Sequence, residues 1–284
     1  MKKVLFFTFS SIILLAFIIK LISPRNDDGG FGDEKASFAI LEDNWDVSGV
    51  NDSHVEDCLD SSVIIHYLGF DVCYDTKKLQ PVWVDYTLTK EQVWATENTP
   101  KIPHHFMQDP NLSLPQASDE DYKGVHKLYG LSKGHMARHQ DMKWSLQATQ
   151  ESDYYTNICP QHEKLNTKLW KRIENLVREI AEQYDSVHVI CGPIFTDNAN
   201  GYIGPNRLPV PDYFFKTLLV KDETGYHAIA FLCPNNDIPL TMREAACTVD
   251  NVESLSQIDV YSYLPDKTES SVESNYNTSL WGLK

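Results

Sequence analysis

The middle of the chain holds side chains of the types that hydrolyse phosphodiesters. His135 lies in Ser-Lys-Gly-His-Met-Ala-Arg, and an imidazole with a pKa of about 6.5 can take a proton from water near neutral pH. Asn157 begins Asn-Ile-Cys-Pro-Gln, and Asn166 follows shortly after it. Mg²⁺ prefers oxygen ligands and keeps several waters, so the amide oxygen of Asn166 and a substrate phosphate could hold one ion. These residue types therefore indicate metal-assisted hydrolysis with a histidine general base.

Glu174 and Arg178 continue the series on a predicted helix. Spacings of eight and then four residues place Asn166, Glu174 and Arg178 roughly along one side of it, and the Glu-before-Arg order favours an ion pair. Each residue alone has an ordinary structural explanation: His135 as a core histidine, Asn166 as a helix cap, and the charged pair as a surface salt bridge. Their joint spacing favours a catalytic site.

This order resembles the DNA/RNA non-specific endonuclease family, the ββα-metal nucleases that include Serratia nuclease and endonuclease G. The matching residues are Gly134, His135, Asn157, Pro160, Gln161, Asn166, Glu174 and Arg178, followed by Cys191-Gly-Pro193, Val210-Pro211, Phe215-Lys216 and Pro234-Asn235. The resemblance runs from about Ile64 to Pro265, which is most of the chain.

The resemblance implies an activity and a role for each residue. It implies metal-dependent cleavage of both DNA and RNA, with a Mg²⁺ ion for which Mn²⁺ could substitute, and products that carry 5′-phosphates. It also implies that Glu174 positions metal-bound waters and that Asn157 supports the site. The expected site is His135, Lys133, Asn157, Glu174 and Arg178 as catalytic residues, Lys133, Arg138 and Arg178 as substrate contacts, and Asn166 as the metal ligand.

Several positions depart from the family pattern. The family's Asp and Arg before Gly-His are Ser132 and Lys133 here, and near Phe106, where the family often has an Arg, there are only lysine and histidine. Lysine keeps a positive charge but cannot bind a phosphate through a planar fork. An alternative interpretation is therefore a catalytically weakened nucleic-acid-binding module of the same fold. A third is an inert exported interaction protein, which only the acidic flanks of the chain favour.

His135 and His139 are four residues apart, which is also the histidine spacing of a zinc peptidase. Such an enzyme carries both histidines on a helix with a Glu directly after the first, and Met136 occupies that position. Gly134 also argues against a helix interior at this point. No Cys-x-x-Cys spacing indicates a zinc site elsewhere.

The charge of the chain is unevenly distributed. The formal net charge is −15, which argues against a basic nucleic-acid-binding surface over the whole protein. Between Asp121 and Arg178, however, ten cations face six anions, so this stretch carries +4 within an acidic protein. The basic stretch contains the candidate site. No protein partner is indicated by the sequence.

The hydrophobic pattern predicts an α+β fold. Residues 61–89 and the stretches 186–191, 213–220 and 227–232 read as strands, the first followed by a short helical turn at 90–95. Residues 98–130 read as loop, 167–184 as an amphipathic helix and 249–255 as a last helix. With 42% apolar residues the chain can build one sizeable core. We therefore expect a central antiparallel sheet flanked by helices, with the ββα-metal motif that the resemblance implies.

The N-terminal segment predicts export. Lys2 and Lys3 precede an apolar run over residues 4–22, which is typical of either a cleaved signal peptide or a membrane anchor. We expect residues 1–22 to be that segment, 23–55 a linker and N-terminal extension, 56–266 the nuclease domain, and 267–284 a loosely ordered tail in which Trp281 docks. The nuclease domain would then be periplasmic, extracellular or anchored outside the cytoplasm.

Six cysteines are compatible with export. We expect a disulfide between Cys58 and Cys73. Cys191 and Cys233 lie in apolar, strand-like runs, where buried free thiols are expected.

Overall fold

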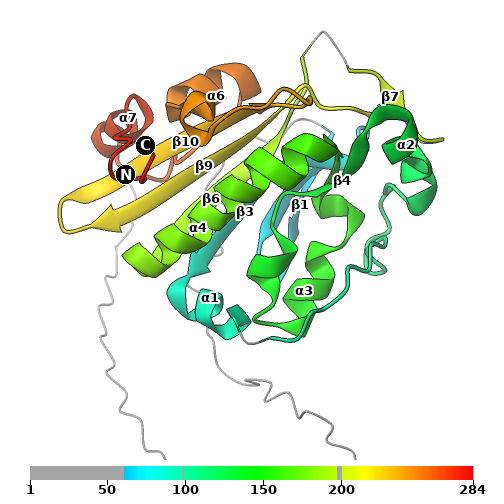
Figure 1. Ribbon diagram of the computed structural model, residues 1–284, viewed down its shortest axis with the longest axis horizontal. Coiled ribbons are helices and arrows are strands. Elements are labelled where there is room, and N and C mark those ends of the chain that lie inside the picture. The colour runs from blue at the N-terminus through cyan, green and yellow to red at the C-terminus, as the bar shows by residue number, and fades with distance from the viewer. Residues whose placement is uncertain (1–60, 98, 197–199, 284) are drawn as a thin grey trace, which may run out of the picture. The chain divides into compact units, whose positions relative to one another are not determined.

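The computed structural model describes residues 61–97, 99–196 and 200–283 (Figure 1). The predicted signal or anchor, the linker and Cys58 lie outside the described residues. Among the described residues, no helix has the length and apolar character needed to cross a membrane.

A seven-stranded sheet forms the centre, in the order β1-β2-β3-β6-β9-β10-β11, and every neighbouring pair is antiparallel. Its strands are β1 (Ser62–His66), β2 (Asp71–Asp75), β3 (Gln80–Thr89), β6 (Ser186–Ile194), β9 (Tyr213–Asp222), β10 (Gly225–Pro234) and β11 (Ala246–Cys247). The predicted strands are confirmed: the stretch 61–89 contains β1, β2 and β3, and β6 continues to Ile194 beyond Gly192-Pro193.

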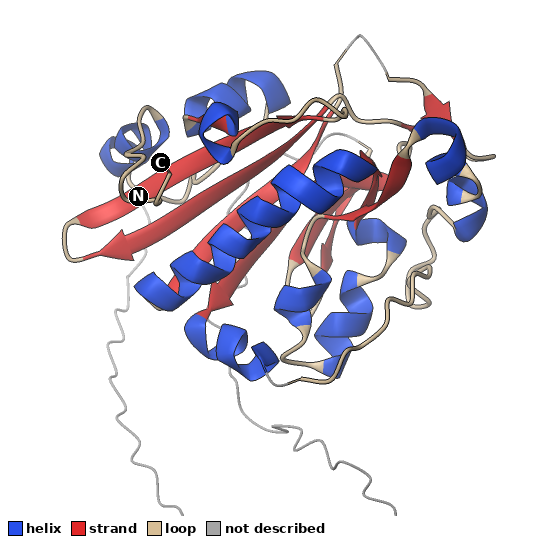
Figure 2. Ribbon diagram, in the orientation of Figure 1, coloured by secondary structure: helices blue, strands red, loops and turns tan. Residues whose placement is uncertain are grey.

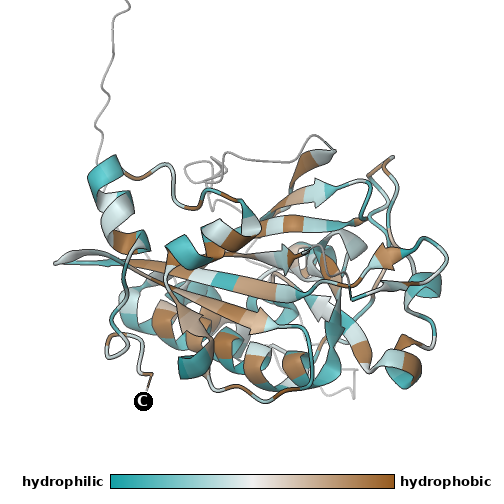
Figure 3. Ribbon diagram, turned by 90° about the horizontal axis from the view of Figure 1, so that it is seen from above, coloured by the Kyte–Doolittle hydropathy of each residue, from teal (hydrophilic) through white to brown (hydrophobic). Residues whose placement is uncertain are grey.

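Helices cover both faces of this sheet, as Figures 1 and 2 show. The central strands β6 and β9 are buried along nearly their whole length, which requires cover on both sides. On one face Val84, Val189 and Phe214 pack with α4 (Lys171–Tyr184); on the other, Trp83 and Phe215 pack with the two C-terminal helices. Apolar residues accordingly gather on the strands and the helix faces turned toward them (Figure 3). The expected α+β class with a central antiparallel sheet is confirmed.

The shorter elements lie around this framework. They are α1 (Lys90–Glu97), η1 (Asp119–Tyr122), α2 (Val125–Tyr129), η2 (His139–Met142), α3 (Leu146–Ser152), η3 (Tyr155–Asn157), β7 (Tyr202–Ile203), β8 (Leu208–Pro209), α5 (Met242–Ala245), α6 (Val249–Ser256) and α7 (Asp266–Glu273). The helix at α6 was predicted, whereas α2 falls within the stretch read as loop and α7 within the stretch read as a loose tail. The tail prediction is therefore wrong for α7, and the docking of Trp281 is confirmed because its side chain is buried.

A second hairpin and the long helix make the ββα unit. Strand β4 (Leu131–His135) pairs antiparallel with β5 (Ile158–His162), and η4 (Leu165–Trp170) then leads into α4. Gly134 is required here, because a Cβ at this position would lie 2.5 Å from Oε1 of the buried Gln161. The glycine lets β4 lie close to β5, and His135 follows it at the end of the strand.

The predicted helix 167–184 is confirmed with a different beginning. Its first part, η4, is π-helical and starts at Leu165, so Asn166 lies inside the first turn instead of capping it. π-Helical turns are rare, and they occur frequently at functional sites. From Lys171 the helix is regular and buries Ile173, Val177 and Ile180.

The cysteines among the described residues agree with the predicted disulfide and the predicted buried thiols, as far as the structure describes them. Cys73 is disulfide-bonded, whereas its expected partner Cys58 lies outside the described residues. Cys191 and Cys233 are free and buried, as predicted, and Cys159 and Cys247 are also free.

Candidate active site

The candidate base, His135, is held by a carboxylate. Its Nε2 lies 2.9 Å from Oδ1 of Asp153, the C-cap residue that directly follows α3, and both side chains are largely buried. The backbone N–H of His105 donates to the other oxygen, Oδ2, at 2.6 Å, which fixes the carboxylate. A neutral His135 therefore donates its Nε2–H to Asp153 and keeps the lone pair on Nδ1 for accepting a proton.

The electrostatics keep His135 neutral near neutral pH. Burial lowers the pKa of His135, and this effect outweighs the hydrogen bond and charge of Asp153, which act in the opposite direction. Burial alone would raise the pKa of Asp153, but hydrogen bonds from the surrounding histidines hold it well below its usual range. The pair is thus a neutral imidazole beside an ionised carboxylate, which is the state that a general base needs.

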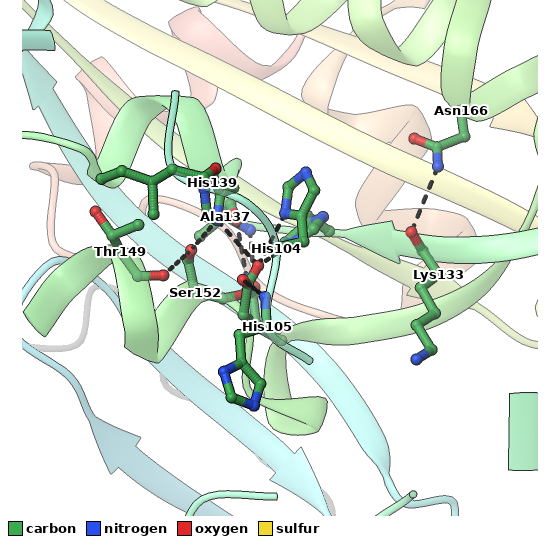
Figure 4. Close-up of polar contacts among 12 residues, drawn as sticks. His104, His105, Lys133, Ala137, His139, Thr149, Ser152 and Asn166 are labelled. Carbon is green, nitrogen blue, oxygen red and sulfur yellow. Dashed lines mark hydrogen bonds and ion pairs between the residues drawn. The ribbon is translucent and has the colours of Figure 1, made fainter. Parts of the chain in front are cut away.

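Two further histidines share the same carboxylate oxygen. His104 Nδ1 lies 3.1 Å and His139 Nδ1 lies 3.0 Å from Asp153 Oδ1, and Figure 4 shows the His104 and His139 side chains close together. His135 ends β4 and His139 begins η2, so the two do not lie on one helix as a zinc peptidase would have them. The sequence interpretation did not place His104, His139 or Asp153 in the site. Two signals in the sequence pointed toward this region: the histidines near Phe106 where the family often has an Arg, and the four-residue spacing of His135 and His139.

Asn157 is buried and acts on the backbone. Its Oδ1 accepts from the N–H of Ala137 at 2.8 Å, and its Nδ2 donates to the carbonyls of Ala137 and Ser152 at 2.8 and 2.7 Å. It therefore ties the residues after His135 to the end of α3, next to Asp153. Asn157 is fully buried, and its printed hydrogen bonds all go to backbone groups of the described residues.

Lys133 has a partner of its own within the protein. Its ammonium forms an ion pair with Asp119 and lies over the ring of Phe106, 4.6 Å from the ring centre. The rings of Tyr155 and Tyr122 are 5.2 and 5.6 Å away. The charge expected to meet a phosphate is thus balanced by an exposed carboxylate.

Asn166 is fixed by the strand that leads to His135. Its Nδ2 donates to Ser132 Oγ at 3.0 Å and lies 3.5 Å from the carbonyl of Lys133. Figure 4 shows Asn166 beside Lys133 and apart from the His104 and His139 side chains. Among the described residues nothing donates a hydrogen bond to its Oδ1, so this hard oxygen is available to a cation. Ser132, which stands where the family has an Asp, holds the amide in this orientation.

Glu174 and Arg178 do not pair with each other, so the predicted ion pair is wrong. Glu174 Oε2 lies 3.3 Å from Nε of Arg138, whereas Arg178 Nη1 lies 3.1 Å from Asp141 Oδ1 and its Nη2 donates to Thr96. The segment after β4 packs on α4 and supplies better-buried partners than an exposed pair along the helix. Burial raises the pKa of Glu174 to about 7, against the lowering effect of Arg138.

Lys216 supports the backbone beside His135. It is fully buried on β9, its ammonium donates to the carbonyl of Met136 at 3.2 Å, and it lies 4.6 Å from the centre of the Trp170 ring. The Trp170 indole in turn donates to the carbonyl of His135 at 3.2 Å. The Phe215-Lys216 motif was recognised in the sequence without a role, and the structure gives it one.

Comparison with known proteins identifies the family. Residues 55–267 match the model of the DNA/RNA non-specific endonucleases. The chain belongs to this family. It is 30% identical to the mitochondrial nuclease EXOG of Xenopus laevis over 61% of this chain and 50% of that protein, and 27% identical to mitochondrial endonuclease G of Bos taurus over 66% and 65%. Identity to human mitochondrial EXOG is 30%, over 71% of this chain and 57% of that protein.

The solved structures agree at the level of the fold. The crystal structure of the EndoG/EndoGI complex, described as showing the mechanism of EndoG inhibition, superposes with a TM-score of 0.63 at 22% identity, over 72% of this chain and 88% of that one. The chain spans between half and just under two thirds of the length of the curated nucleases named above. The resemblance inferred from the motifs is confirmed.

Proposed function

We propose that the protein is a Mg²⁺-dependent, sugar-non-specific endonuclease that hydrolyses phosphodiester bonds in DNA and RNA. The observation that carries the proposal is the His135–Asp153 pair at the end of β4: burial favours the neutral imidazole, Asp153 occupies Nε2, and none of the described residues bonds to Nδ1. Family membership supports the reaction class, because the related proteins are named nucleases.

The residues of the chain divide the work of hydrolysis. His135 Nδ1 accepts a proton from the attacking water, while Asp153 holds the opposite side of the ring and stabilises the imidazolium that forms. Arg178 and Arg138 are partly exposed and hold positive charge along α4, where a substrate phosphate would approach. Glu174 and Asp141 keep the two guanidinium groups in place, since Glu174 forms an ion pair with Arg138 and Asp141 accepts a hydrogen bond from Arg178.

The residues present fit a Mg²⁺ ion at Asn166. Its Oδ1 is a hard ligand left free by the bond from Nδ2 to Ser132, and an ion that keeps most of its waters needs few protein ligands. When bound there, the ion would neutralise phosphate charge and stabilise the leaving oxygen. Mn²⁺, which favours the same oxygen donors, is the expected substitute.

Cleavage of both nucleic acids follows from what the site contacts. The proposed roles concern phosphate, water and one metal ion, and none of them uses a base edge or a 2′-hydroxyl. Substrate choice would then depend on the backbone alone.

The second candidate is a nucleic-acid-binding module with weakened catalysis. The ion pair between Lys133 and Asp119 favours it, because it reduces the positive charge next to His135. The deciding experiment is incubation of the purified protein with plasmid DNA and with RNA, in Mg²⁺ and in EDTA. We expect both substrates to be degraded in Mg²⁺ and neither in EDTA. Intact substrate from mildly acidic to mildly basic pH, in Mg²⁺ and in Mn²⁺, would establish the binding module instead.

We also propose that the protein is exported. The N-terminal lysines and apolar run support this, and so does the disulfide at Cys73, because disulfides persist in oxidising compartments. Fractionation of producing cells, with N-terminal sequencing of the mature protein, tests export and separates a cleaved signal from an anchor. Recovery in the cytoplasm would overturn the proposal.

A further inference from the structure

We propose that His104, His135, His139 and Asp153, here called the histidine cluster, form a second metal site that takes a transition-metal ion of the Zn²⁺ type. We further propose that this ion switches off His135 as a base, a consequence that rests on the function proposed above. The cluster uses nitrogen donors and lies apart from Asn166, so it is a different site from that of Mg²⁺.

The four ligand atoms already converge. The three ring nitrogens lie 2.9, 3.0 and 3.1 Å from Asp153 Oδ1, and all four atoms lie within 4.8 Å of one another. A tetrahedral Zn²⁺ ion with bonds of roughly 2.0–2.1 Å separates its ligand atoms by about 3.3 Å, so shifts of roughly an ångström would complete the site.

Hydrogen bonding alone accounts poorly for this arrangement. A carboxylate oxygen has about two lone pairs, yet three ring nitrogens point at Oδ1 while Oδ2 is taken by the N–H of His105. One oxygen is therefore offered more donors than it can accept, and a cation shared among the four groups removes the conflict.

The tautomer of His139 gives the second argument. Its Nε2 lies 3.3 Å from the carbonyl of Ile102, which can only accept, so Nε2 carries the hydrogen. With that hydrogen on Nε2, the contact of 3.0 Å between Nδ1 and the Asp153 carboxylate needs either a second proton on the ring or a metal ion shared by the two groups, and a Zn²⁺-type ion can take that place. A ring whose other nitrogen donates to a backbone carbonyl is the usual arrangement of a metal-binding histidine.

The histidine cluster is buried except at one edge, through which an ion could enter. The side chains of Asp153, His139 and His135 are 3, 6 and 12% exposed, whereas that of His104 is 51% exposed and forms the open edge. Imidazole with one carboxylate favours Zn²⁺, Cu²⁺ or Ni²⁺ over Mg²⁺. The cluster is thus largely pre-formed and selective by its donor atoms.

A metal ion bound at the histidine cluster would stop His135 from acting as a base, because it would fix the ring in the wrong tautomer. The ion takes Nε2 of His135, the nitrogen that otherwise donates to Asp153. A neutral imidazole bound through Nε2 keeps its one hydrogen on Nδ1, and Nδ1 then has no lone pair with which to accept a proton from water. The ion therefore inhibits hydrolysis while Mg²⁺ remains at Asn166.

Metal binding is tested first, without reference to activity. The full chain is stripped with a chelator, dialysed, and titrated with Zn²⁺ by calorimetry; Co²⁺ absorption reports the coordination geometry. We expect one tight site per chain, and His104→Gln and His139→Gln should each weaken it by roughly tenfold or more. His227→Gln is the matched control, since His227 pairs with a single carboxylate, Asp222, outside the cluster. Absence of a tight site, or equal affinity in all three variants, would overturn the proposal.

Inhibition is tested next, at fixed Mg²⁺ with increasing Zn²⁺. Each variant is normalised to its own rate without zinc, and thermal melting checks that it is folded. We expect half-inhibition at zinc concentrations roughly tenfold or more higher in His139→Gln than in His227→Gln. Zinc bound at the cluster without inhibition would overturn the switch and leave the site. A chain that binds zinc but shows no nuclease activity under any condition would overturn the proposed function and the switch together, while calorimetry still decides the site.

Discussion

Replacing Asp153 by Asn isolates the contribution of the carboxylate that holds His135. The change removes a charge-assisted hydrogen bond of 2.9 Å to Nε2 and leaves an amide of nearly the same shape. A hydrogen bond to a charged group contributes about 1.5–3 kcal/mol, which corresponds to a loss of roughly 10–100-fold in kcat/KM. This loss should remain below that of removing the base itself, which is about 10²–10⁴-fold.

The pH profile separates this role from a merely structural one. The hydrogen bond and charge of Asp153 raise the pKa of His135, so their removal should lower that pKa further below its usual value of about 6.5. Because the base acts when it is neutral, the acidic limb of kcat/KM should move to lower pH in Asp153→Asn. The assay is initial-rate cleavage of a fluorescent oligonucleotide duplex from acidic to basic pH at fixed Mg²⁺.

Asp222→Asn is the matched control, since Asp222 pairs with His227 on the β9–β10 hairpin. It should leave both the rate and the pH profile unchanged. A folded Asp153→Asn variant with the rate of the parent, or with a lower rate and an unmoved acidic limb, would refute the reasoning that Asp153 acts through His135.

Three further predictions follow from the geometry of β4. His135→Ala should lower kcat by roughly 10²–10⁴-fold without unfolding the protein, and a near-parental rate would mean that another group is the base. Lys133→Ala should lower kcat/KM by roughly 10–100-fold and reduce its salt dependence, because one phosphate contact is lost. Asp119→Asn should raise kcat/KM by at most about fivefold, since it releases Lys133 from an exposed ion pair. Identical rates and salt dependence in the parent and both variants would show that Lys133 points away from substrate. Gly134→Ala should lower the free energy of unfolding in urea by about 1–3 kcal/mol, because the added Cβ would lie 2.5 Å from Gln161 Oε1. An unchanged urea midpoint of unfolding would show that β4 and β5 can move apart to accommodate the methyl group.

Local patterns predicted most of the fold. The helix at 167–184 and the β9–β10 hairpin follow from periodicity within a few residues, and packing did not override them. The π-helical start was not predicted because π-helical turns are rare, and the spacing of Leu165, Leu169 and Trp170 also fits an ordinary α-helix. The helix α7 was missed because its sequence is mostly polar and only Val272 and Glu273 are buried.

The site was predictable where its residues form one local motif and not where they meet through space. The family spacing pointed to His135, Asn166 and Glu174. Asp153 reaches His135 only because the long segment between β4 and β5 folds back onto β4. No local sequence pattern predicts this contact. The mistaken pairing of Glu174 with Arg178 has the same origin, since burial against the segment after β4 decides the partners.

The buried Lys216 on β9 connects the core of the sheet to the backbone beside His135. Lys216 donates to the carbonyl of Met136 and is enclosed by the rings of Trp170 and Tyr86, so the residues next to His135 rest on core packing instead of on a flexible loop. Selection for folding and selection for turnover therefore act on the same side chains. Laboratory evolution toward higher heat resistance should find few tolerated changes at Lys216, Trp170 and Tyr86, and random mutations that loosen the sheet should lower activity before they lower solubility.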